Sequence, residues 1–182
     1  LFTASGQSGG LEGVIREELT LTMSQFLDSY DESLRQSAIE MVAPFFPSAL
    51  FVFWLVMMVV NAALAQGILV RWNRNLRPTP DITQVELPNI LPMAIAAASV
   101  IALLGEGTSA YAARNLVVIF SVPYFFSGLG VIHALMRRVA DGILPLVLFY
   151  VFLLFLGWPI FVITGLGFID HWMGLRETLN AP

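Results

Sequence analysis

The chain has 182 residues, of which 57% are apolar and only 12% charged, whereas soluble domains have roughly 45–50% apolar and about 25% charged residues. This composition excludes an ordinary water-soluble fold. The sequence contains no cysteine and no lysine, so disulfides, thiolate metal sites and lysine Schiff bases are excluded. A net charge of −4 without a large basic cluster argues against a nucleic-acid partner.

Residues 1–10 are small and polar and lack the features of a signal peptide. Because the chain begins at Leu1, we interpret this residue as an internal start with upstream helices missing. Residues 1–10 are then a flexible lead-in to the first helix.

Residues 11–42 carry an apolar stripe at spacings of three and four, which predicts one long amphipathic helix. Seven acidic residues and two arginines give this segment a charge of −5. Helices that lie on lipid usually have a basic polar face, so we favour packing against protein and keep the membrane interface as the alternative. The stripe consists of Leu11, Ile15, Leu19, Met23, Phe26, Tyr30, Leu34, Ala38 and Met41.

Four uncharged stretches of 30, 19, 22 and 28 residues follow. About 20 mainly apolar residues suffice for a helix to cross a bilayer. The sequence therefore predicts an all-α, polytopic transmembrane bundle with the lipid bilayer as a partner. Its transmembrane domain is residues 43–182, with spans at about 46–70, 89–104, 113–135 and 143–169.

Prolines punctuate these spans. Pro44 and Pro47 mark the turn into the first span, because proline is tolerated at a helix start but not in its interior. Pro123 and Pro159 lie inside the third and fourth spans, where each should kink its helix. Such kinks either line a cavity or merely improve packing.

Arginine placement predicts the orientation, because short cytoplasmic loops carry excess positive charge. The compact loops after the first and third spans are placed inside, and the amphipathic helix and the C-terminus outside. The inside arginines are Arg71, Arg74, Arg77, Arg137 and Arg138.

Enzyme signatures are missing from the sequence. Two histidines do not build a helix-spaced zinc site. Ser127 is followed by Gly128, but Phe125 stands where a Gly-x-Ser-Gly nucleophile motif has its first glycine, and Gly105 belongs to a lone G-x-G. We expect no catalytic activity, no metal and no cofactor. Without a P-loop, the chain is not an ATPase either.

Polar residues inside the predicted spans are the candidate site, because they are costly in a bilayer unless they find partners. Asn61, Gln66 and Ser121 either face a shared cavity and bind a substrate, or form hydrogen bonds between helices. His133 is interpreted as an interfacial residue.

Charged residues at the span ends form a second candidate set. Arg114 and Asp170 are placed at the same membrane face, where they either pair or are solvated separately. Asp170 and Arg176 are six residues apart, about 600° of rotation on a straight helix, so we do not expect them to pair.

Three short motifs resemble the C-terminal part of the YybS-like predicted bacterial membrane proteins, a family of unknown function. The motifs are Leu87, Pro88 and Pro92; Gly128, Leu129, Gly130, Val131, Ile132 and His133; and Gly165, Leu166, Gly167, Phe168, Ile169, Asp170, His171, Trp172 and Arg176.

This resemblance implies a multi-pass protein of the bacterial cytoplasmic (inner) membrane, similar in helical layout to the substrate-binding components of energy-coupling-factor transporters. The implied function is a non-ATPase substrate-binding or translocating component that works with other membrane subunits. The alternative is a non-catalytic scaffold or assembly subunit of a membrane complex. The two differ in whether the polar residues of the spans line a cavity or are buried in helix contacts.

Overall fold

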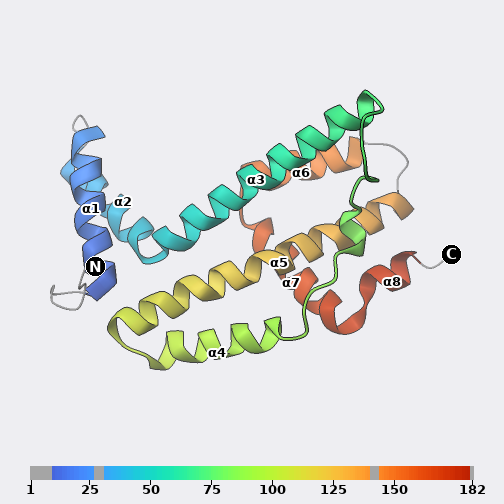
Figure 1. Ribbon diagram of the computed structural model, residues 1–182. Helices are drawn as coiled ribbons and strands as arrows, with labels where there is room; N and C mark the ends of the chain where they lie inside the picture. Colours follow the sequence, from blue (N-terminus) through green and yellow to red (C-terminus); the bar gives the residue numbers. More distant parts are fainter. Residues whose placement is uncertain (1–9, 27–30, 140–143, 181–182) are drawn as a thin grey trace. The chain divides into compact units, whose positions relative to one another are not determined.

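The computed structural model describes residues 10–26, 31–139 and 144–180, and every regular element within them is a helix (Figure 1). The expected all-helical class is confirmed. The elements are α1 (Gly10–Phe26), α2 (Glu32–Val42), η1 (Ala43–Phe45), α3 (Phe46–Arg71), η2 (Ile82–Gln84), α4 (Leu91–Leu104), α5 (Gly107–Val139), α6 (Leu144–Leu156), α7 (Pro159–Met173) and α8 (Leu175–Asn180).

The chain forms two compact units. The first comprises Leu1–Met58 and Pro92–Ile119, and the second comprises Val59–Leu91 and Phe120–Pro182. Within the first unit, α1 packs against α2 and η1. Within the second, α6 contacts α7, and α7 contacts α8.

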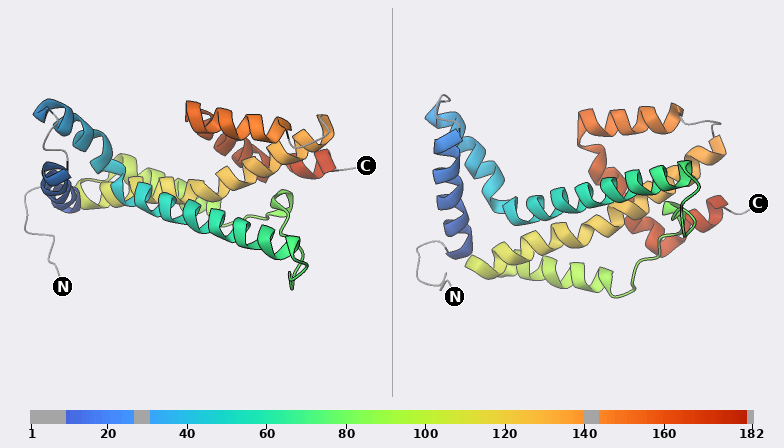
Figure 2. Two further views of the ribbon diagram at one scale, coloured as in Figure 1. Left: turned by 90° about the horizontal axis from the view of Figure 1, so that it is seen from above. Right: turned by 45° about the horizontal axis from the view of Figure 1, so that its top comes forward.

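The amphipathic segment is two helices rather than one long helix, which corrects the prediction from the apolar stripe. Figure 2 shows α1 and α2 lying side by side. Asp31 caps the start of α2, where its side chain accepts the N–H of Ser33, and such a cap favours a new helix start. The stripe residue Tyr30 lies outside the described residues. A stripe at helical spacing does not reveal this break, because both helices keep the same period.

The burial of this segment also differs from the prediction. Ile39, which is not part of the stripe, is 3% exposed, whereas Leu34 and Met41 are 62% and 77% exposed. The remaining α1 stripe residues are half-buried apart from the exposed Phe26. Because α2 folds back on α1, the face of α2 that is buried differs from the face that carries the apolar stripe.

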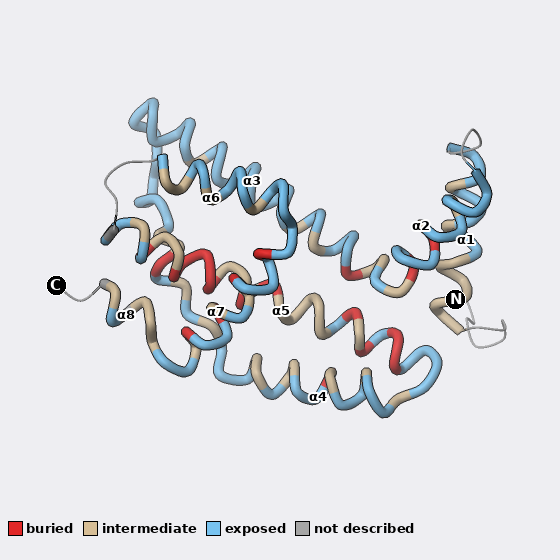
Figure 3. Tube along the Cα trace, turned by 180° about the vertical axis from the view of Figure 1, so that it is seen from behind, coloured by how far each residue is buried: buried red, intermediate tan, exposed pale blue. Residues whose placement is uncertain are grey.

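Helix α3 coincides with the first predicted span to within one residue, and in it only Ser48 is buried. Only 6% of the residues in its most apolar stretch are buried, and Figure 3 shows the helix exposed along most of its length. An uncharged, apolar helix with so little protein around it is typical of a lipid-facing span.

Helix α5 is the second candidate span. It is ten residues longer than the predicted 113–135 and continues through Pro123 as one helix. Helix α4 has 14 residues, about 21 Å of helix, which is shorter than the ~30 Å hydrocarbon core.

The fourth predicted span is broken. The chain bends by 119° between α6 and α7, with Gly157 in the left-handed region at φ 66° and Pro159 in the first turn of α7. Glycine adopts this conformation without strain, and proline starts a helix readily. Among the described residues, two helices are long and apolar enough to cross a membrane, and the number of candidate spans is three if the bent pair is one span. The four predicted spans are not confirmed.

Candidate functional site

The second unit contains a buried ion pair between Asp170, near the end of α7, and Arg176 in α8. Nε of Arg176 donates to Oδ2 of Asp170 at 2.6 Å, and the side chains are 14% and 2% exposed. The backbone N–H of Arg176 donates to Oδ1 at 2.9 Å. This corrects the expectation that the two residues face apart. Helix α7 ends at Gly174, whose φ of 59° is left-handed, so the chain turns and returns Arg176 to Asp170.

Asp170 is also held by the middle of α5. Oγ of Ser127 donates to Oδ2 of Asp170 at 3.1 Å, and both residues are buried. Ser127 lies three residues from Tyr124, the centre of the apolar stretch 113–135, or about 4.5 Å along the helix. Asp170 therefore contacts the middle of a candidate span, where a charged group needs a partner.

Glycines bring α7 and α5 together at this point. A Cβ at Gly167 would clash with the carbonyl of Tyr124, and one at Gly128 would clash with the carbonyl of Ile163. Small residues allow such close backbone contact in membrane helices. Both glycines belong to the motifs singled out in the sequence, and their spacing on the two helices explains why Asp170 reaches Ser127.

The loop between α3 and α4 completes the surroundings of Arg176. Nη1 of Arg176 donates to the carbonyl of Val85 at 2.7 Å and to that of Thr83 at 3.4 Å. Gly130 makes room, because a Cβ there would lie 2.8 Å from the Ile82 carbonyl and 3.2 Å from Cδ of Arg176. One guanidinium thus joins α7, α8 and this loop.

Beside the ion pair lies a cavity of about 630 Å³, within the size range of small-molecule sites. Its wall is formed by the loop and by the end of α7, through Thr83, Gln84, Val85, Glu86, Leu87, Asn89, Asp170, His171, Gly174 and Arg176.

The polar groups of this wall fall into two sets. Asp170 and Arg176 are occupied with each other and with backbone groups. Gln84, Glu86 and Asn89 have side chains without a hydrogen bond to any other described residue. These side chains and the ring of His171 are available to a ligand.

A buried hydroxyl close to this wall also lacks a partner. Tyr124 is fully buried, and its hydroxyl has no hydrogen bond among the described residues. Its ring contacts that of His171, with centroids 5.8 Å apart. A buried polar group without a partner marks a place where water or a ligand group completes the bonding.

The three predicted cavity residues do not line this cavity. Asn61 is exposed on α3. Gln66 donates to the carbonyl of Arg77 and to Oγ1 of Thr79, at 3.4 Å each, and therefore ties a loop to its helix. Ser121 is half-buried in α5. The structure thus places each in a different environment.

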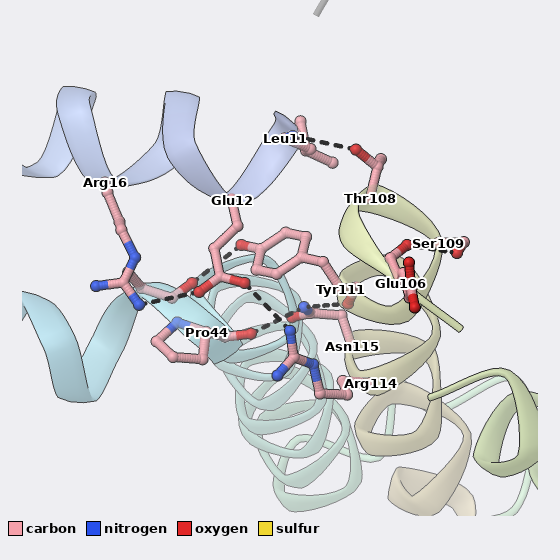
Figure 4. A network of polar contacts seen from close by, with 11 residues as sticks. Leu11, Glu12, Arg16, Pro44, Glu106, Thr108, Ser109, Tyr111, Arg114 and Asn115 are labelled. Atoms are coloured by element: carbon pink, nitrogen blue, oxygen red, sulfur yellow. Dashed lines mark hydrogen bonds and ion pairs between the residues drawn. The ribbon is translucent and has the colours of Figure 1, made fainter. Parts of the chain in front are cut away.

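Of the two alternatives for Arg114 and Asp170, an ion pair or separate solvation, neither describes the structure, because each residue pairs with another partner. Nη2 of Arg114 donates to Oε2 of Glu12 at 3.1 Å, and Arg16 donates to Oε1 of the same carboxylate at 2.9 Å. Both ion pairs belong to the first unit (Figure 4), whereas Asp170 pairs with Arg176.

Two further motif residues, His133 and Trp172, have different surroundings. Nδ1 of His133 lies 2.8 Å from the carbonyl of Leu129, and its Nε2 lies 3.4 Å from the hydroxyl of Tyr150. Trp172 is 70% exposed and stacks edge-on with His171. Neither side chain lines the cavity.

The first unit contains a polar network that forms hydrogen bonds with backbone groups at the start of α3 (Figure 4). Pro47 has no N–H to donate to the carbonyl of Ala43. This carbonyl accepts the N–H of Phe46 and the hydroxyl of Tyr111, the latter at 3.0 Å. The side chain of Asn115 accepts the N–H of Ser48 and donates to the carbonyl of Pro44, at 3.0 Å each. This network has a structural role at the point where α3 begins.

Sequence reasoning missed the loop residues of the cavity, above all Thr83 and Val85. Their contribution is made by backbone carbonyls, which carry no residue-type signal. The available signals were Glu86 and Asn89, polar residues next to the Leu87–Pro88 motif. Among the described residues, no group of three or more histidine or acidic side chains could hold a metal ion.

Comparisons with known proteins give one match. No curated protein and no solved structure matches the chain. The expected similarity to energy-coupling-factor components and the bacterial origin stay predictions, which no comparison supports. Residues 15–171 match the family described as "Predicted membrane protein (DUF2232)", and this match covers most of the chain. The chain therefore belongs to this family of predicted membrane proteins.

Proposed function

We propose that this protein is a non-ATPase component of a transport system that binds a small polar solute in the cavity beside Asp170 and Arg176. The observation that carries this proposal is a polar cavity whose wall includes Asp170, a buried carboxylate that is bonded to Ser127 in the middle of α5, where a polar group is costly unless it has a partner. Broken helices near the bilayer centre are a recurrent way to build solute sites in transporters, and the chain between α6 and α7 has a break of this kind.

The chemistry of the cavity favours a neutral or cationic solute. Glu86 and Asp170 outnumber Arg176 in the wall, which leaves a net charge of −1. The C-terminal end of α7 also contributes backbone carbonyls, the negative end of the helix dipole. Gln84 and Asn89 supply amide groups that donate and accept hydrogen bonds.

In the proposed transport cycle, the bent pair of helices α6 and α7 changes conformation. Gly157 and the start of α7 at Pro159 supply a joint, and a change at this joint alters the cavity because Asp170 lies on α7. Energy comes from a separate subunit in the cytoplasmic membrane of a bacterium. The arginine-rich loop after α3 and the last turn of α5, with Arg137 and Arg138, face the cytoplasm.

A solute screen tests this function. The purified protein in detergent is mixed with amino acids, nucleosides and water-soluble vitamins, and unfolding is followed by heating. A solute near one hundred times its Kd stabilises a protein by about 2.7 kcal/mol, which raises Tm by several degrees. A panel with no stabilising compound contradicts the proposal.

A matched pair of variants locates the solute. Asn89→Leu changes the cavity wall and should abolish the solute-induced rise in Tm. Asn61→Leu makes the same change on the exposed face of α3 and should preserve it. Loss of the rise in Asn61→Leu alone would place the solute elsewhere.

The alternative function, a membrane scaffold, is favoured by the exposed apolar surface of α3. A scaffold holds partner proteins without binding a solute. Mass spectrometry of the protein purified from native membranes distinguishes the two, because a scaffold should carry stoichiometric protein partners and no small molecule.

A further inference from the structure

We infer that the second unit binds anionic phospholipid headgroups at its arginine end, defined as residues 71–81 together with Arg137 and Arg138. The proposal does not depend on the cavity or its solute. It rests on how α3 ends, on how the following loop is held, and on the charge that results.

Helix α3 ends in a closed turn that presents arginines on both sides of it. Asn73 is left-handed with φ 53°, and the N–H groups of Asn73 and Arg74 donate to the carbonyls of Val70 and Leu69. This is the Schellman arrangement, which satisfies the last helix carbonyls and turns the chain. Arg71 is the last residue of the helix, and Arg74 follows the turn.

The loop then runs back along α3. Gln66 donates to the carbonyl of Arg77 and to Oγ1 of Thr79, and Gln66 lies five residues before Arg71, or about 7.5 Å along the helix. The loop is thereby held around the last turns of α3, so its arginines gather at the apolar helix end.

The loop also connects this helix end to the end of α5. Both oxygens of Asp81 accept hydrogen bonds from the guanidinium of Arg137, at 3.1 and 3.3 Å. Arg138 is the next residue and is exposed. The ends of α3 and α5 therefore form one basic surface within the second unit.

The charge of this surface is not neutralised among the described residues. Arg71, Arg74 and Arg77 are exposed, and their side chains form no ion pair there. Among its described residues this surface has five arginines and one acidic residue, Asp81, which is already paired with Arg137. Asp141 lies outside the described residues, and including it still leaves a net charge of +3.

The position of the arginines selects a lipid over a soluble anion. The last turns of α3 are apolar and exposed, and Trp72, next to Arg71, is 66% exposed. Tryptophan is enriched at the level of lipid headgroups, and each basic residue near an anionic membrane surface contributes about 1 kcal/mol of attraction. Guanidinium groups also match phosphate oxygens with paired hydrogen bonds.

Lipid retention measured by native mass spectrometry tests the site. The full chain is reconstituted in nanodiscs of phosphatidylcholine mixed with phosphatidylglycerol, and the ratio of the two lipids that stay bound is measured. We expect phosphatidylglycerol to be preferred. The triple variant Arg71→Gln, Arg74→Gln, Arg77→Gln should lose this preference by on the order of a hundredfold.

Two further variants control for charge and for folding. The triple Arg→Lys variant should keep most of the preference, because it keeps the charge. Arg35→Gln in α2 removes one arginine elsewhere and should leave the preference unchanged. Equal Tm values in pure phosphatidylcholine show that the variants are folded.

An unchanged preference in the triple Gln variant overturns the proposal. An equal loss in Arg35→Gln also overturns it, because the effect would then follow total charge. The last control compares inorganic phosphate with phosphatidylglycerol in detergent. If phosphate alone raises Tm as much as phosphatidylglycerol does, the site binds a soluble anion and the lipid assignment is wrong.

Discussion

Asp170 and Arg176 form an ion pair at 2.6 Å that also fastens the loop between α3 and α4, because Arg176 reaches the carbonyls of Thr83 and Val85. The pair closes across a left-handed turn at Gly174. The ion pair thereby holds in place the loop that forms part of the cavity wall.

Removing one partner of this pair should be costly. Arg176→Leu leaves a buried carboxylate without its cation and should destabilise the protein by about 3–5 kcal/mol. The double variant with Asp170→Leu should lose less than the sum of the single losses. Unfolding in mixed detergent micelles measures all three variants, and strictly additive losses would show that the two residues do not interact.

Gly167 should be far more sensitive to substitution than Gly165, two residues earlier on α7. A Cβ at Gly167 meets the Tyr124 carbonyl, whereas Gly165 has nothing within 4 Å. We expect Gly167→Ala to destabilise by roughly 1–3 kcal/mol, and Gly165→Ala to be neutral or to stabilise slightly through helix propensity. Thermal unfolding in detergent compares them. Equal Tm values would mean that α7 does not contact α5 as described.

The contact of α1 with α5 depends on Glu12. Its carboxylate is shared by Arg114 and Arg16, so Glu12→Gln should weaken the contact by up to about 1 kcal/mol, as for other partly exposed pairs. Faster amide hydrogen exchange in α1 is the expected signature. Glu17→Gln, an exposed position on the same helix, is the control, and equal exchange in both variants would contradict the role of Glu12.

Asp81 should make stability depend on pH in the acid range. Hydrogen bonds from Arg137 and then from Thr83 hold the pKa of Asp81 at about 2, below its ordinary 3.8. A lowered pKa stabilises the folded state above the unfolded value and loses this contribution as pH falls from about 4 to about 2. Asp81→Asn should flatten the stability profile in this window, measured by denaturation in detergent. Glu106→Gln should follow the unaltered protein.

The C-terminus is expected on the same membrane side as Arg138. Helices of 13 and 15 residues with a bend of 119° between them reach about 21 Å end to end, less than the ~30 Å core, so we expect the pair to enter the membrane and return to the same side. This differs from the outside C-terminus expected for a continuous fourth span.

Reporters that are active only in the cytoplasm check this topology. Fusions after Arg77 and at the C-terminus should be active, and a fusion after Gly107 should be inactive. A C-terminal fusion that behaves like the one after Gly107 would show that the bent pair crosses the membrane.

The agreement between the predicted and the observed helices differs from one part of the chain to another. Helix α3 was predicted to within one residue because an uncharged apolar stretch and its flanking prolines and arginines carry that information. The break in the amphipathic segment and the 119° bend were missed, since neither changes the helical period or the absence of charge. At the site, the motifs singled out in the sequence contain Gly128, Gly167, Asp170 and Arg176, but the sequence did not predict that Asp170 bonds to Arg176 and to Ser127.

The sequence by itself determined that this chain is helical and membrane-embedded, because the need to bury backbone groups in lipid leaves few alternatives to apolar helices. Only the tertiary structure decided what the charged residues do. Arg176 meets carbonyls more than 90 positions away, and it does so because a left-handed glycine redirects the chain and two further glycines let α7 approach α5. Such contacts depend on where backbones meet in space, which residue spacing along one helix does not encode.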